Sequence, residues 1–388
     1  MAFQSRDTQP LKQGRLLYID NLRIVLTALV ILHHLAIQYG APGITYYVEE
    51  GPMSDISAIL MTLFLAINQS FFMGFFFMVS SYFSPGSFDR QGAGPYVRDR
   101  LKRLGIPLLF YILIISPLLH YVLTLSRGFD GNFLEFIPAF IESLPGIDVG
   151  PLWFVAALLF FSLIYVLWRL IFRSTYIAHD GESRALSNAS IIIFAVALGL
   201  ATFFVRIWFP VGWEFMLLHW QFSHFTQYIA MFVIGLIAYK RGWFAGLTES
   251  QGKVWRWVIL ALILVFPVLF VLGGALEGKL EPIMGGFHWQ SFAYSLWEQF
   301  MCVAMVVTLV VWFRKRFNNQ NTLGKALSSG AYATYVIHAP VIVLLALALR
   351  GIQLDMALKF VIVAPFAVGL SFLAGYLIKK LPLARSIL

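Results

Sequence analysis

The chain has 388 residues, of which 60% are hydrophobic and only 12% are charged, and its formal net charge is +9. A soluble protein of this length could not cover so much apolar surface, so the composition predicts a polytopic membrane protein. The single cysteine, Cys302, excludes an internal disulfide and argues against a structural zinc site. The positive charge fits the topology of a membrane protein better than it fits nucleic-acid binding.

Hydropathy predicts an all-α fold with about ten transmembrane helices, each long enough to cross roughly 30 Å of hydrocarbon. The predicted spans are 17–39, 59–83, 104–126, 151–172, 188–209, 215–239, 255–275, 291–313, 329–350 and 358–379. They divide the chain into an N-terminal tail, residues 1–16, a membrane domain, residues 17–380, and a C-terminal tail, residues 381–388.

The lysines and arginines predict the orientation of these spans. With the N-terminus inside, the inner segments carry 22 basic residues and the outer segments carry five, Arg206 and Lys359 among them. Because cytoplasmic loops are enriched in lysine and arginine, this split predicts that both termini are cytoplasmic.

Three ionisable residues lie inside the first predicted span, namely Asp20, Arg23 and His34. A charge at the centre of a spanning helix costs about 2.5–3.5 kcal/mol on insertion scales, so such residues usually face the protein interior. The spacing from Arg23 to His34 places them within about 20° of one helix face and roughly 16 Å apart along the axis. Asp20 falls near the same face, whereas His33 is rotated away by about 100° and is expected to be structural. We therefore expect this face to line a channel that runs into the membrane.

A basic cluster that includes Arg100 and Arg103 precedes the third predicted span. In a helix, side chains at this spacing can point the same way, and the guanidinium fork suits the recognition of phosphate. Basic clusters beside a membrane helix also set topology and contact anionic lipid, and composition alone favours that second interpretation.

Two later spans each carry a polar candidate. Glu298, in the eighth span, either pairs with a buried cation, for which Arg23 and His34 are candidates, or lies at the membrane interface. His338, in the ninth span, either packs between helices or lines a cavity that Pro340 opens by loosening the backbone.

Trp153, at the outer start of the fourth span, either anchors the helix at the lipid headgroups or stacks on a sugar. His120 and His288 are expected to be structural, as is His33. His219 and His224 both fall in the predicted sixth span, on different faces, so no metal site is predicted.

Several motifs follow one another in an order that is typical of one family. Tyr18-Ile-Asp20-Asn-Leu-Arg23, followed by His34, resembles the opening signature of the acyltransferase-3 family of integral membrane acyltransferases. Further matches in order are Phe75–Phe83, Arg100–Pro107 with its Arg-x-x-Arg motif, Pro151–Phe154 and Tyr335–Pro340. The Trp-Glu-Gln sequence around Glu298 is similar to the branch that contains glucan-modifying, succinyltransferase-like members.

The resemblance implies transfer of an acyl group, acetyl or succinyl, from cytoplasmic acyl-CoA to a hydroxyl of an extracytoplasmic glycan or related, lipid-linked acceptor. It implies a multi-pass protein of the bacterial inner membrane, with acyl-CoA as a substrate and no permanently bound cofactor. The implied roles are catalysis for His34, Arg23, Asp20 and Glu298, donor binding for Arg100 and Arg103, and acceptor binding for Trp153 and His338.

Two other functions also fit a bundle with buried ionisable residues. One is a proton-coupled secondary transporter, and the other is a flippase for lipid-linked glycans. Neither needs a cytoplasmic Arg-x-x-Arg motif, and neither depends on an acyl donor. The sequence leaves open whether the protein is a homo-oligomer.

Overall fold

The structure is a computed structural model that describes residues 16–172 and 186–388. Within these ranges, ten helices are long and apolar enough to cross a membrane, as the sequence predicts. The predicted N-terminal tail, except for Leu16, lies outside the described residues. The cytoplasmic location of the two termini stays a prediction.

Nine of the candidate spans contain one main helix each. These helices are α1 (Leu17–Gln38), α2 (Asp55–Tyr82), α8 (Trp153–Phe172), α9 (Asn188–Trp208), α10 (Phe222–Arg241), α12 (Glu249–Leu272), α14 (Trp289–Arg316), α15 (Thr322–Leu349) and α16 (Met356–Lys380). Shorter helices connect them or flank them: α3 (Ser84–Gln91), α7 (Phe133–Ser143), η3 (Gly150–Leu152), α11 (Trp243–Gly246), η4 (Ala275–Glu277), α13 (Glu281–Met284) and α17 (Pro382–Arg385).

The third span is one long helical rod, Ala93–Ser126, rather than the predicted 104–126. It consists of α4 (Ala93–Arg100), η1 (Leu101–Gly105), α5 (Ile106–Phe110), η2 (Tyr111–Ile115) and α6 (Ser116–Ser126), of which η1 and η2 are π-helical turns. Pro107 cannot donate to the carbonyl of Arg103, four residues before it, and the Tyr332 hydroxyl donates to that carbonyl instead, at 2.8 Å. The proline therefore loosens the helix and ties it to α15.

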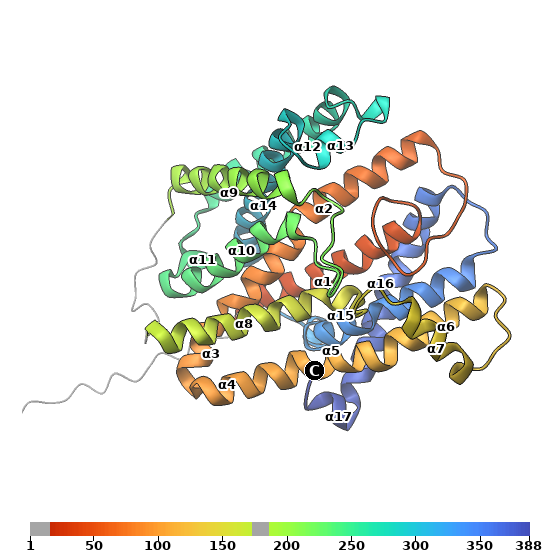
Figure 1. The fold of residues 1–388 in the computed structure, drawn as a ribbon. Coiled ribbons are helices and arrows are strands. Elements are labelled where there is room, and N and C mark those ends of the chain that lie inside the picture. Colours follow the sequence, from red (N-terminus) through yellow and green to blue (C-terminus); the bar gives the residue numbers. More distant parts are fainter. Residues whose placement is uncertain (1–15, 173–185) are drawn as a thin grey trace, which may run out of the picture.

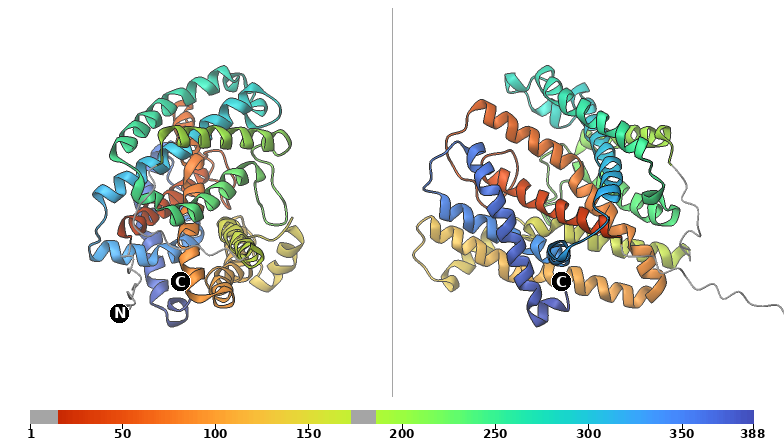
Figure 2. Two further views of the ribbon diagram at one scale, coloured as in Figure 1. Left: turned by 90° about the vertical axis from the view of Figure 1, so that its left-hand side faces the viewer. Right: turned by 180° about the vertical axis from the view of Figure 1, so that it is seen from behind.

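The bundle has two halves that meet at α1 and α2 (Figures 1 and 2). On one side, α9, α10, α12 and α14 pack together; on the other side, α15 and α16 pack on each other and on α1. Helix α2 contacts α1, α10 and α14, and it therefore joins the two halves. The residues of α1 and α2 consequently lie at the centre of the molecule, where a site shared by both halves can form.

The sixth predicted span, 215–239, is wrong at its start, because α10 begins only at Phe222. His219 therefore lies outside the helix, in a turn with a positive φ of 52°, and its Nδ1 is 3.2 Å from a carboxylate oxygen of Glu214. An isolated bridge joins Phe215 to Trp220, and the Phe215 ring stacks on Phe222. The apolar residues of this segment thus pack as a loop over the helix end, which hydropathy cannot distinguish from a span.

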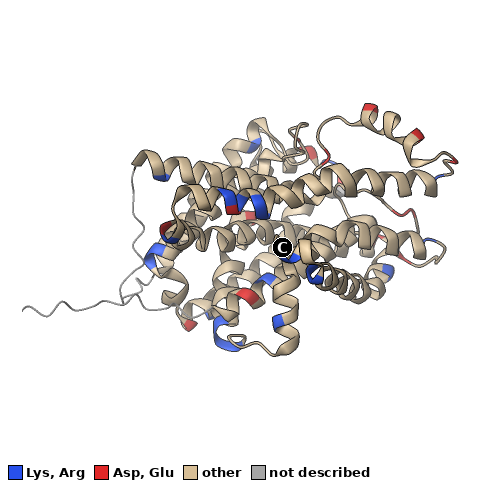
Figure 3. Cartoon of the chain, turned by 90° about the horizontal axis from the view of Figure 1, so that it is seen from below, with Lys and Arg blue, Asp and Glu red and all other residues tan. Residues whose placement is uncertain are grey.

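One short helix, α7, lies in a loop where the sequence analysis predicted no structure. Asn132 and Glu135 form a reciprocal capping box at its start, and Phe136 and Phe140 are buried on one face. Figure 3 shows acidic residues along the helix-containing loop at the right-hand edge of the molecule. The residues that follow α7 lead directly into the fourth span.

Candidate functional site

Two predicted site residues from distant parts of the chain, His34 in α1 and His338 in α15, lie face to face. Their ring centroids are 5.2 Å apart. The close packing of α1 on α15 brings them together. His338 is fully buried, and His34 is partly buried.

The Tyr335 carbonyl fixes the protonation of His338. Nδ1 of His338 is 2.6 Å from this carbonyl oxygen, which can only accept a hydrogen bond. Nδ1 therefore carries the proton, and Nε2 has a free lone pair. Nε2 is buried and has no hydrogen-bond partner among the described residues. An unpaired buried acceptor is costly, so this nitrogen is a candidate contact for a substrate hydroxyl.

His33, expected to be structural, packs beside the pair. Its ring is stacked on Phe72 with centroids 4.9 Å apart, and it meets His34 edge-on at 5.7 Å. The Asn68 amide nitrogen is 3.3 Å from His33 Nδ1 and donates to the Leu29 carbonyl at 3.1 Å. His33 is thus held in place by α2, and it supports one side of His34.

Arg23 and Asp20 form an ion pair at the other end of the predicted face. The closest nitrogen and oxygen are 3.9 Å apart, and the Arg23 side chain is 42% exposed. The neighbouring Asn21 donates to the carbonyls of Phe317 and Asn319 at 2.7 and 2.9 Å. This end of α1 is thereby attached to the loop that joins α14 to α15.

Glu298 has other partners than the candidates that the sequence suggested. Its Oε2 accepts from Arg206 Nη2 at 2.6 Å, and its Oε1 is 3.2 Å from His224 Nδ1. Arg206 is fully buried, and it also donates to Ser295 at 3.3 Å. Arg23 and His34 are therefore not the cations that pair with Glu298. The expectation of a buried cation is confirmed, but the cation is Arg206, because α9 packs closely on α14.

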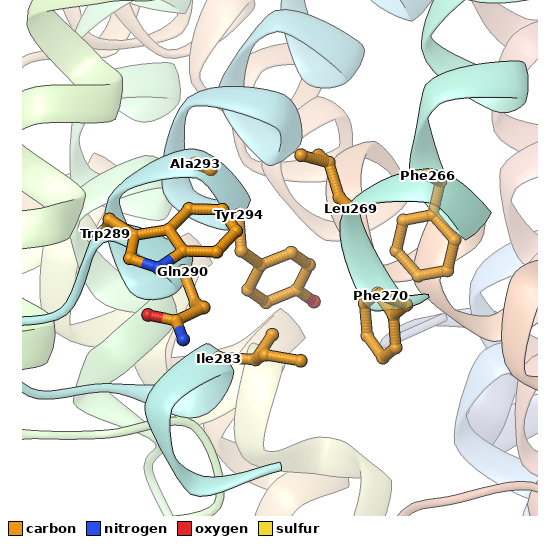
Figure 4. A pocket seen from close by; sticks show the side chains of 8 residues that line it. All are labelled: Phe266, Leu269, Phe270, Ile283, Trp289, Gln290, Ala293 and Tyr294. Carbon is orange, nitrogen blue, oxygen red and sulfur yellow. The ribbon is translucent and has the colours of Figure 1, made fainter. Parts of the chain in front are cut away.

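Tyr294, which contacts Arg206, also lines a small hollow, and Figure 4 shows the side chains around it. It is lined by Phe266, Leu269, Phe270, Ile283, Trp289, Gln290, Ala293 and Tyr294, and its cavity volume is about 10 Å³. The Tyr294 ring lies 5.1 Å from the Arg206 guanidinium carbon. A cavity of this volume holds about one water molecule, so this hollow is not the substrate site.

Trp153 packs inside the bundle on an aromatic partner. Its ring is stacked on Tyr228 of α10 with centroids 5.4 Å apart, and Tyr228 is in turn stacked on His224 at 6.2 Å. Gln69 of α2 donates to the Tyr228 hydroxyl at 3.2 Å. The tryptophan thus links the fourth span to the half of the bundle that holds Glu298.

Arg100 and Arg103 have different partners. Arg100 lies over the Tyr96 ring at 4.8 Å and donates to the Ser84 hydroxyl at 3.4 Å. Arg103 pairs with Asp99 at 2.9 Å, and its side chain is 62% exposed. Arg100 is the last residue of α4, whereas Arg103 lies within the π-helical turn Leu101–Gly105.

Helix α15 contacts the backbone of Arg103 and also carries His338. The Tyr332 hydroxyl binds the Arg103 carbonyl, and His338 lies six residues further along α15. At about 1.5 Å per residue, this is a rise of roughly 9 Å. This rise separates the backbone positions of Tyr332 and His338 on α15, while the Arg103 side chain is exposed and pairs with Asp99.

Comparisons with known proteins identify the family of this chain. Residues 16–378 match the family described as an acyltransferase domain, type 3. The chain belongs to the acyltransferase-3 family. It is 25% identical over 246 residues to glucans biosynthesis protein C of Escherichia coli K12, and 24% identical to the protein of that name from E. coli O1:K1. Each alignment covers 59% of this chain and 60% of the relative, and no solved structure gave a significant match.

Proposed function

We propose that this acyltransferase-3 family protein moves an acyl group, acetyl or succinyl, from cytoplasmic acyl-CoA to a hydroxyl of a glycan or lipid-linked sugar on the outer side of the bacterial inner membrane. The observation that carries the proposal is the buried pair of His34 and His338, in which one nitrogen has a fixed lone pair and no partner. Family membership supports the chemistry, and the names of the relatives support a glucan acceptor.

The donor would bind from the inner side. Arg100 and Arg103 are cations that can hold the phosphates of CoA, and their different orientations suit two separate phosphate groups. The pantetheine arm would then follow the side of α15 that joins Arg103 to His338. Only this thin arm enters the membrane, because the charged nucleotide cannot leave water at acceptable cost.

The acceptor would bind from the outer side. Its reacting hydroxyl would donate to His34, a neighbouring hydroxyl of the same acceptor would donate to Nε2 of His338, and a sugar ring would contact Trp153. His34 takes the hydroxyl proton as the acceptor oxygen attacks the thioester carbon. The tetrahedral intermediate then collapses, the carbon–sulfur bond breaks, and the CoA thiolate receives the proton. Asp20 would keep Arg23 oriented toward the donor.

The Glu298 network favours one competing function, a proton-coupled transporter. A carboxylate, a guanidinium and an imidazole buried together in a membrane bundle are typical of proton relays. A transporter does not require acyl-CoA, so binding of the donor distinguishes the two functions.

The test uses purified protein in detergent with radiolabelled acetyl-CoA or succinyl-CoA and a glucan oligosaccharide. We expect CoA to raise the unfolding temperature and label to appear on the oligosaccharide. Arg103→Ala should weaken CoA binding by about 1.5–3 kcal/mol if this arginine makes a charge-assisted bond to phosphate. If CoA leaves the unfolding temperature unchanged while a small solute raises it, the result would contradict the proposal and favour transport.

A further inference from the structure

Asp148, in the loop between α7 and η3, joins three distant parts of the chain. Its Oδ1 accepts from the Tyr46 hydroxyl and from the Gly150 N–H, both at 3.0 Å. Its Oδ2 accepts from the Ser116 hydroxyl at 2.5 Å and is 3.0 Å from His120 Nε2. The loop after α1, the third span and the turn into the fourth span therefore meet at one carboxylate.

Both carboxylate oxygens of Asp148 have hydrogen-bond partners within the protein. This side chain is therefore suited to fixing neighbouring residues rather than to binding a ligand. Burial by itself would raise the pKa of Asp148, but the hydrogen bonds from His120 and Ser116 lower it below its usual value. Asp148 is therefore ionised at neutral pH, and hydrogen bonds to an ionised group are about twice as strong as those between neutral groups.

The turn that Asp148 holds is connected to the histidine pair. Gly150 has a positive φ of 46°, and a side chain there would collide with the hydroxyls of Tyr46 and Tyr111. The next residue, Pro151, accepts a hydrogen bond from the Tyr335 hydroxyl. The Tyr335 carbonyl is the group that fixes His338. Three hydrogen bonds, linked through the backbone at 150–151 and through Tyr335, thus connect Asp148 to the site.

The same turn sets the start of α8. Trp153 is the first residue of that helix, two positions after Pro151, and its ring stacks on Tyr228. A shift of the turn would therefore move Trp153 and His338 together, and these are the two residues that the proposed function places next to the acceptor.

We propose that Asp148 is a positioning residue for acyl transfer, which fixes the turn at 148–153 and, through Tyr335, holds His338 in place against His34. This inference rests on the proposed function. Asp148 does not contact the reacting atoms, and Ser116 and His120 act only as donors that keep its Oδ2 in place.

The main test compares Asp148→Asn with Asp130→Asn, a change of an exposed acidic residue in the same outer loop. An asparagine cannot accept from both Ser116 and His120 while it also holds Tyr46 and Gly150. We expect kcat for transfer to the glucan oligosaccharide to fall by about 10- to 100-fold, as for a displacement of about 1 Å at a site. The affinity for CoA should stay unchanged, because the arginines lie at the inner end, and Asp130→Asn should behave like the wild type.

Two variants of His120 supply the conservative control. Glutamine at this position keeps an N–H that can donate to Asp148, whereas leucine does not. We expect His120→Gln to retain most of the activity and His120→Leu to lose activity as Asp148→Asn does. Should Asp148→Asn fail to fold, the difference in kcat between these two variants decides the question, and equal values would overturn the proposal.

A double-mutant cycle tests the route through Tyr335. If Asp148 acts through the turn, Asp148→Asn should cost much less in a Tyr335→Phe background than in the wild type. Fully additive losses would contradict the inference. A wild-type protein with no transfer from acyl-CoA would instead contradict the proposed function, so the two failures are distinguishable.

Discussion

At the scale of single residues, the histidine pair has a division of roles that the structure makes testable. His338 has a fixed tautomer and is fully buried, whereas His34 has a less constrained ring. The proposed function assigns proton transfer to His34 and hydroxyl binding to His338.

Replacement of each histidine by alanine should therefore have a different effect. His34→Ala should abolish transfer without changing CoA affinity, because general-base catalysis contributes about 10²–10⁴-fold. His338→Ala should raise KM for the glucan oligosaccharide, since it removes a hydrogen-bond acceptor from the bound hydroxyl. Steady-state kinetics with labelled acyl-CoA measures both, and a His34→Ala protein with normal kcat would remove this histidine from the mechanism.

The buried ion pair of Glu298 and Arg206 gives a second prediction at this scale. Their side chains are 1% and 0% exposed, so removal of one partner leaves an uncompensated charge in the core. Glu298→Ala should lower the free energy of unfolding by about 3–5 kcal/mol. Glu298→Leu combined with Arg206→Met should cost less than Glu298→Ala, because no charge stays buried. Thermal unfolding in detergent measures the difference, and an unstable double variant would contradict this account.

The sequence reveals only some of these residues. The face of α1 can be predicted, because helical periodicity alone aligns Arg23 with His34. The pairing of Arg206 with Glu298 cannot, since 92 residues separate them and only the packing of α9 on α14 brings them together. Arg206 lies near the predicted outer end of an apolar helix. A count of charges alone therefore assigned it to a loop. Lys359, also assigned to the outer side, is likewise buried and paired with Glu49.

At the scale of elements, local sequence signals explain which helix ends were predicted correctly and which were not. The predicted ends of most spans agree with the helices within a few residues, because a long apolar run has few alternatives in a membrane. The error at α10 arose because the loop before it is as apolar as a span. Helix α7 was detectable in principle, since Asn132 and Glu135 have the spacing of a capping box in front of amphipathic residues.

The proline in the third span gives a prediction for an element. Tyr332→Phe leaves the Arg103 carbonyl without its donor, because Pro107 has no N–H to offer. We expect a loss of about 0.5–1.5 kcal/mol in stability, together with weaker CoA binding as the π-helical turn shifts. Pro107→Ala restores an N–H for this carbonyl, so the double variant should recover stability. Denaturation in detergent tests this, and a double variant less stable than Tyr332→Phe would show that the hydroxyl has another role.

At the scale of the whole molecule, the proposed reaction requires access to the protein from both sides of the membrane. The donor is cytoplasmic and the acceptor is not, so the arginines at one end of the bundle must face the cytosol while Trp153 and Asp148 face outward. The distribution of lysine and arginine predicts this orientation, and it is open to a direct chemical test.

Cysteine labelling in intact cells gives that test, because the native Cys302 is fully buried and should not react. Glu142 in α7 and Lys325 near the start of α15 are both exposed, and they lie at opposite ends of the bundle in the predicted topology. A membrane-impermeant maleimide should label Glu142→Cys in intact cells, and it should label Lys325→Cys only after the cells are permeabilised. The unmodified protein is the matched control and should stay unlabelled in both conditions. The reverse pattern would place the arginines on the side where acyl-CoA is absent, and the proposed transfer could then not take place in the cell.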